Sequence, residues 1–63
     1  MRSINEVTKK ITEAMFGYFA LGPMDSGVIY HNLLMNKGNE IMTCSEEELD
    51  EMIDYEIEIY YNG

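Results

Sequence analysis

Cysteine and histidine are almost absent from this sequence. Among 63 residues, Cys44 is the only cysteine and His31 the only histidine. One cysteine cannot close a disulfide within the chain, and two soft ligands fall short of the four that a structural zinc site takes. We therefore expect no metal and no cofactor, and stability that depends on a small core and on association. A single cysteine is typical of a reducing compartment, so we expect a cytoplasmic protein.

Positive charge and long hydrophobic runs are also scarce. The four basic residues face twelve acidic ones, which gives a formal net charge of −8; the basic residues are Arg2, Lys9, Lys10 and Lys37. The basic footprint of a nucleic-acid-binding domain is missing, and anionic membranes repel such a charge. The apolar run from Ala14 to Leu21 is far shorter than the roughly 20 residues of a spanning helix, and no cleavage site follows it. We expect one small domain, residues 1–63, that binds neither nucleic acid nor membrane directly.

Motifs for catalysis are lacking as well. The five glycines are scattered rather than gathered into a phosphate-binding loop, and no calcium-binding loop motif is present. The carboxylates are numerous and uniform, whereas acid–base catalysis needs two environments that separate their pKa values. His31 is typical of a surface or structural histidine, and Cys44 has no activating neighbour in the sequence. The sequence therefore predicts a protein that is not an enzyme.

Two capping boxes are present and predict two helices. Ser3 with Glu6, and Ser45 with Glu48, have the spacing at which each side chain satisfies a free backbone N–H. The first helix is expected from about Ser3 to Leu21, where Gly22-Pro23 stops it. Its apolar stripe comprises Ile4, Val7, Ile11, Met15 and Tyr18. The stripe expected after Ser45 comprises Leu49, Met52, Ile53, Ile57 and Tyr60.

Two segments allow more than one interpretation. Residues 27–44 favour a β-hairpin, because Val28, Ile29 and Tyr30 are poor helix formers and Asn36-Lys37-Gly38 fits a turn. The alternative is a second helix from about Pro23 to Lys37. Residues 55–61 alternate and leave a short strand as the alternative to one continuous last helix. The expected fold class is α+β, ordered helix, β-hairpin, helix; the alternative is an all-α three-helix bundle.

Acidic residues are concentrated near the end of the chain. Eight of the twelve acids lie between Glu46 and Glu58, and no basic residue follows Lys37. Five of them fall opposite the apolar stripe of the last helix: Glu47, Asp50, Glu51, Asp54 and Glu58. Like charges four residues apart destabilise a helix, and this cost suggests that the acids have a use. The other interpretation is a solvated face that keeps a small apolar protein in solution.

These patterns lead to two functional hypotheses. Acids at every third or fourth position form a line of negative charge that imitates a phosphate backbone and attracts basic protein surfaces. We therefore expect a small acidic, non-catalytic inhibitor or regulator of a nucleic-acid-handling protein. Phages and mobile elements encode inhibitors of this general class, which is an analogy only. The alternative is a homo-oligomeric accessory protein whose acidity only confers solubility, with a homodimer contact through Phe16, Phe19 and Leu21.

Overall fold

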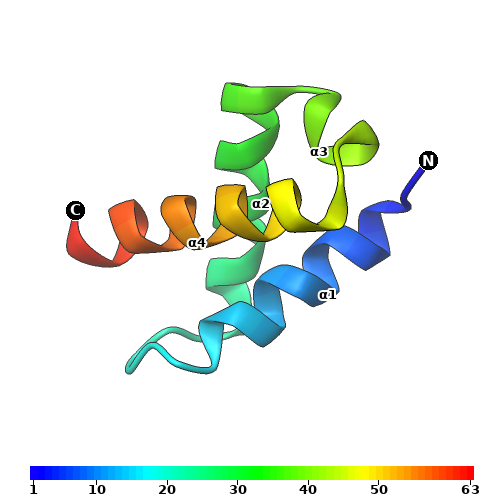
Figure 1. Cartoon of the computed structure of the whole chain (residues 1–63). Coiled ribbons are helices and arrows are strands. Elements are labelled where there is room, and N and C mark those ends of the chain that lie inside the picture. The colour runs from blue at the N-terminus through cyan, green and yellow to red at the C-terminus, as the bar shows by residue number, and fades with distance from the viewer.

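The computed structural model describes all 63 residues, and every regular element in it is a helix (Figure 1). The four helices are α1 (Ile4–Met15), α2 (Pro23–Lys37), α3 (Glu40–Thr43) and α4 (Glu46–Asn62). Helices α1, α2 and α4 contact one another pairwise, and the short α3 contacts α2. The expected α+β fold with a β-hairpin is therefore wrong, and the all-α alternative fits, with one short helix added.

Signals at both ends of α2 explain why this segment is a helix. Pro23 begins it with a backbone angle suited to the first helical position. The Oδ2 atom of Asp25 accepts a hydrogen bond from the backbone N–H of Gly22 at 2.6 Å. Gly38 ends the helix with φ 58° and ψ −137°, a conformation that essentially only glycine adopts. The N–H of Gly38 donates to the carbonyl of Leu34 at 2.9 Å.

Packing outweighs the poor helix propensity at the start of this segment. Ile29 is fully buried and Leu33 is 1 % exposed, so both contribute to the core at helical spacing. Intrinsic propensity amounts to a few tenths of a kcal/mol per residue, and burial of two large aliphatic side chains exceeds it. The returning strand expected from Glu40 to Cys44 is replaced by α3, whose Ile41 is also fully buried.

Helix α1 is shorter than expected. It ends at Met15 rather than at Leu21. The N–H of Tyr18 donates to the carbonyl of Met15 at 2.9 Å, which forms a tight turn in place of another helical turn. Ala20 then has a positive φ of 74°. Residues 16–22 therefore form a loop, and the Tyr18 ring anchors it edge-on against Tyr61 of α4, with ring centroids 5.1 Å apart.

Helix α4 is continuous to Asn62, so the alternative strand at 55–61 is wrong. Both capping boxes are confirmed. The Ser3 Oγ accepts from the Glu6 N–H at 3.2 Å, and the Ser45 Oγ accepts from the Glu48 N–H at 3.1 Å. Acidic side chains in the first turn of α4 also complement the positive end of the helix dipole.

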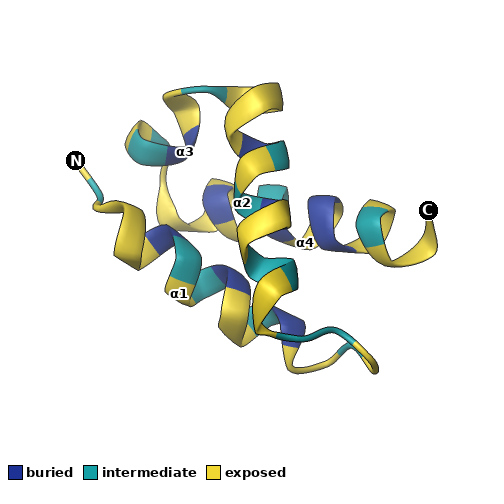
Figure 2. Ribbon diagram, turned by 180° about the vertical axis from the view of Figure 1, so that it is seen from behind, coloured by how far each residue is buried: buried dark blue, intermediate teal, exposed yellow.

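The core is built from one side of each helix. Its nine buried residues are Val7, Ile11, Met15, Ile29, Leu33, Ile41, Leu49, Ile53 and Ile57. Most of both expected apolar stripes lies in this cluster or packs against it, although Ile4 is 56 % exposed. Figure 2 shows the same pattern as buried bands on the inner sides of the helices. No helix combines the length and the apolarity that crossing a bilayer requires.

Two polar contacts join distant parts of the chain. The Tyr60 hydroxyl of α4 donates to Oδ1 of Asp25 at the start of α2. This bond, together with the bond from the Gly22 N–H, lowers the pKa of Asp25, and the same carboxylate raises the pKa of Tyr60. At the other end of the molecule, the Arg2 guanidinium donates to the carbonyls of Ile41 and Cys44. The N-terminus is thereby tied to α3 and to the start of α4.

Candidate partner-binding surface

The eight acids of α4 divide into two equal groups. Four have an internal role or position. Glu48 caps the helix, Glu46 and Asp50 form ion pairs, and Glu56 is only 9 % exposed. The other four are exposed and form no ion pair; they are Glu47, Glu51, Asp54 and Glu58. We call these four residues the acidic row.

Long-range contacts account for the ion pairs. Lys10 of α1 places its Nζ atom 2.8 Å from Oε2 of Glu46 and 2.9 Å from Oδ1 of Asp50. The Arg2 Nε atom lies 3.4 Å from Oε1 of Glu46. The sequence offered no neutralising residue after Lys37, but the fold brings two bases from the N-terminus to the first half of α4. Asp50, one of the five predicted docking residues, is therefore engaged within the chain.

These ion pairs change the titration of their members. The hydrogen bonds from Asp50 and Glu46 raise the pKa of Lys10. The hydrogen bond from Lys10 lowers the pKa of Glu46. Lys10 therefore pairs with α4 and not with Glu6, which lies four residues before it on α1. The Glu6 carboxylate accepts a hydrogen bond from the Ser3 N–H.

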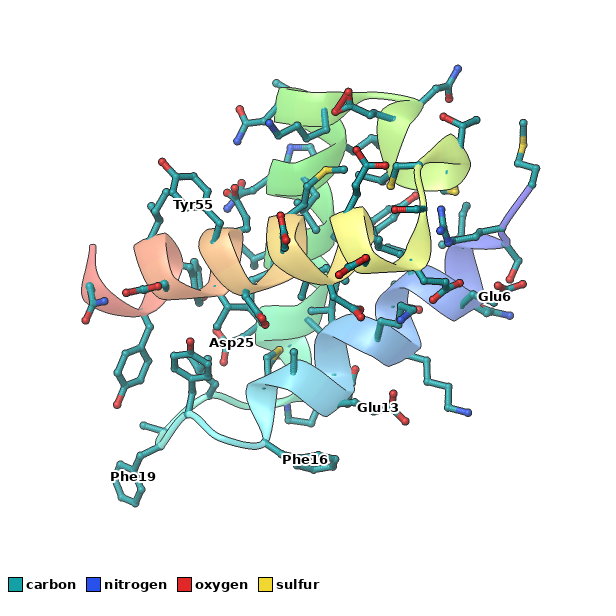
Figure 3. All side chains as sticks on the ribbon, viewed as in Figure 1. Glu6, Glu13, Phe16, Phe19, Asp25 and Tyr55 are labelled. Atoms are coloured by element: carbon teal, nitrogen blue, oxygen red, sulfur yellow. The ribbon has the colours of Figure 1, made fainter.

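The acidic row is straight and regular. Its members follow one another at steps of four, three and four residues, and such steps keep side chains on one face of a helix. From Glu47 to Glu58 the row extends for about 16 Å along the axis at the helical rise of 1.5 Å per residue. Tyr55 projects from another side of α4 (Figure 3). The arrangement therefore presents an uninterrupted line of carboxylates on a stable helix.

The residues suggested for a homodimer contact lie in the loop between α1 and α2. Phe16 and Phe19 are 83 % and 87 % exposed, and both project from the molecule (Figure 3). Leu21 is half-buried and packs against the core. Phe16 and Leu21 line one shallow groove of about 250 Å³ with Met15, Tyr18 and Pro23, and Phe19 lies outside it. Self-association through Phe16, Phe19 and Leu21 stays a prediction.

The two residues considered for chemistry belong to different segments of the fold. His31 is exposed on α2, whereas Cys44 is half-buried beside the Arg2 guanidinium, with 3.9 Å between Nη1 and Sγ. No group of three or more histidine, cysteine or acidic side chains is arranged to hold a metal ion.

The sequence did not predict one exposed surface, because that surface exists only if residues 23–37 form a helix. The side of α2 that faces away from Ile29 and Leu33 is exposed and largely apolar; we call it the outer face. It comprises Met24, Gly27, Val28, His31, Leu34 and Met35. Figure 2 shows this side of α2 as mostly exposed, with α4 crossing behind it. The helical spacing of these residues was the signal that could have identified the face.

Comparison with known proteins adds no relative: no protein-family model, curated protein or solved structure matches this chain.

Proposed function

We propose that this protein is a non-catalytic binding protein that docks the acidic row of α4 onto a basic surface of another protein. The supporting observation is that four carboxylates in line have no cation of their own chain within ion-pair distance, while Lys10 and Arg2 bind Glu46 and Asp50. Like charges three or four residues apart cost a helix a few tenths of a kcal/mol per pair. A basic partner would turn that repulsion into attraction.

The spacing of the row indicates the class of partner. Carboxylates about 5–6 Å apart along one line present to a basic groove a charge pattern similar to that of a nucleic-acid strand. The partner is therefore a protein whose basic groove otherwise holds nucleic acid, and occupation of the groove would inhibit or regulate it. The alternative role, a homo-oligomeric accessory protein, requires no such partner and no salt-sensitive contact.

The test uses two double variants with the same change in net charge. Glu51→Gln with Glu58→Gln removes two charges from the row. Glu13→Gln with Glu40→Gln removes two exposed charges elsewhere, on α1 and α3. Glutamine keeps the shape and the helix propensity of glutamate, so both variants should fold alike.

The immobilised protein would capture partners from a nuclease-treated lysate of the organism that encodes it, with elution along a salt gradient. A captured protein would then be assayed for displacement of a labelled duplex. Exposed charge pairs are worth about 0.2–1 kcal/mol each, so the row variant should bind roughly 2- to 30-fold more weakly than the control variant. Equal binding by the two variants, insensitivity to salt, or retention of the duplex by the partner would each refute the proposal.

A further inference from the structure

The last turns of α4 are held by different contacts from the rest of the helix. Ile57 is the last fully buried residue of α4, and none of residues 58–63 is buried. Beyond Ile57, Tyr60 alone packs against the core. The ion pairs of α4 lie in its first half, at Glu46 and Asp50. The end of the helix therefore depends on few contacts.

Charge disfavours a helix at this end of α4. Cations stabilise the negative end of a helix dipole, but the last turn of α4 has no basic residue. Glu58 instead brings a negative charge close to that end, and Asp54, one turn earlier, repels it. Contacts with other parts of the fold therefore have to keep these turns helical.

Two adjacent residues of α4 provide those contacts. The Tyr60 hydroxyl donates to Oδ1 of Asp25, near the start of α2. The other oxygen of the same carboxylate accepts from the Gly22 N–H at 2.6 Å. The Tyr61 ring lies edge-on against the Tyr18 ring, with centroids 5.1 Å apart. We call the hydrogen bond from Tyr60 and the ring contact of Tyr61 together the clamp.

The loop of residues 16–22 depends on the same contacts. Phe16 and Phe19 are exposed, so their side chains contribute little burial, and Leu21 packs against the core only where the loop ends. Ala20 has a φ of 74°, a region in which a residue with a Cβ atom is strained. Segments with few buried side chains open at a lower free energy than the core. The loop and the last turns of α4 are both segments of this kind, and each contacts the other.

We propose that the clamp joins the last turns of α4 and the loop of residues 16–22 into one conformational unit, whose two segments open and close together. Both contacts of the clamp come from the same turn of α4, so fraying of that turn breaks them together. The loop then loses its contact with α4. The rest of the core keeps its own buried contacts and stays closed while the unit opens.

Glu58 links the clamp to the acidic row. It is the last of the four carboxylates and lies two residues before Tyr60. The row is therefore complete only while the clamp is closed, and a basic partner that contacts all four carboxylates would favour the closed state. This consequence rests on the proposed function of the row, whereas the clamp itself does not.

Amide hydrogen exchange followed by NMR tests the clamp in the wild-type protein. The N–H of Tyr18 is bonded to the carbonyl of Met15, and this bond breaks when the loop opens. The Tyr61 N–H reports opening of the last turns of α4. The two groups should have the same opening constant, and both should open more readily than the N–H of the buried Leu33.

A pair of matched variants removes one hydroxyl each. Tyr60→Phe removes the donor to Asp25 and nothing else. A single hydrogen bond changes an equilibrium by roughly 2- to 10-fold, so the opening constants at Tyr18 and Tyr61 should both rise by about that factor. Tyr55→Phe removes the same group from an exposed tyrosine of α4 and should leave both constants unchanged.

A double variant tests whether Tyr60 acts through Asp25. Asp25→Ala also removes the acceptor of the Gly22 N–H, so its own effect combines two losses. In the Asp25→Ala protein, however, Tyr60→Phe should produce no further rise in the opening constants, because the acceptor is already gone. A further rise of the same size would show that the Tyr60 hydroxyl acts elsewhere, and would overturn the clamp.

Three other results would also overturn the proposal: unequal opening constants at Tyr18 and Tyr61 in the wild type, a response to Tyr60→Phe at only one of them or at neither, or opening of both as rare as that of Leu33. The function of the acidic row fails separately. Equal partner binding by the row variant and its control, with exchange as expected here, would refute that function and leave the clamp standing.

Discussion

Adjacent leucines of α2 provide a matched test of how this helix packs. Leu33 is 1 % exposed within the core, and Leu34 is 41 % exposed on the outer face. Leu33→Ala and Leu34→Ala remove the same atoms and change helix propensity equally, so the difference between them reports burial alone. We expect Leu33→Ala to be much the more destabilising.

The magnitudes follow from the two environments. A fully buried Leu→Ala change costs about 2–5 kcal/mol, because lost apolar transfer adds to the cost of the cavity. At the partly exposed Leu34 no closed cavity forms, and the buried part of the side chain is worth about 1 kcal/mol at ~25 cal/mol per Å². Native proteins are stable by roughly 0.05–0.15 kcal/mol per residue, which is about 3–9 kcal/mol for 63 residues. Leu33→Ala therefore removes between about a fifth and all of the stability.

Urea unfolding followed by circular dichroism measures the difference. With a slope near 1 kcal/mol per M of urea, typical of a small domain, a difference of about 2 kcal/mol separates the two midpoints by roughly 2 M. Equal losses at the two positions, or a larger loss at Leu34, would refute the assignment of Leu33 to the core.

Two further predictions concern single contacts. Lys10→Met should raise the pKa of Glu46 toward its ordinary value of 4.5, because the hydrogen bond from Lys10 is the main cause of the lowered value. The stability from this ion pair is present above pH 4.5 and is lost as pH falls through the lowered pKa of Glu46 in the folded protein. The urea midpoints of wild type and variant should therefore differ at neutral pH and converge in acid. If NMR showed the same titration of the Glu46 carboxyl group in both proteins, the contact with Lys10 would be contradicted. Gly38→Ala should lower the free energy of unfolding in urea by about 1–3 kcal/mol, since φ 58° with ψ −137° strains any residue with a Cβ atom. An unchanged free energy of unfolding would mean that α2 ends in a different conformation.

Local signals in the sequence were sufficient for the starts of α1 and α4. Each capping box joins residues three apart, so its effect does not depend on the rest of the fold, and both were placed correctly. The extent of α4 was also predicted, because its apolar stripe is long. The end of α1 was predicted too late in the sequence. The apolar residues after Ala14 do not reveal that the Tyr18 N–H bonds to the Met15 carbonyl in a turn, or that the Tyr18 ring packs on Tyr61.

The middle segment could not be decided from propensity. Val28, Ile29 and Tyr30 favour a strand, but the energy that decides their conformation comes from the burial of Ile29 and Leu33 against helices distant in the sequence. The candidate site was predicted in the same partial way. The exposure of the five predicted acids follows from the stripe of α4, whereas the pairing of Asp50 requires Lys10, forty residues earlier.

The fold distributes charge unevenly because the basic residues that form ion pairs all lie against the same part of α4. Arg2 and Lys10 both contact the first half of α4, where they bind Glu46 and Asp50, and Lys9 and Lys37 form no ion pair. The second half of α4 therefore keeps its charge, while the outer face of α2 has none. Salt would weaken the proposed attraction between the acidic row and a basic protein, because it screens the charges that no base of this chain neutralises.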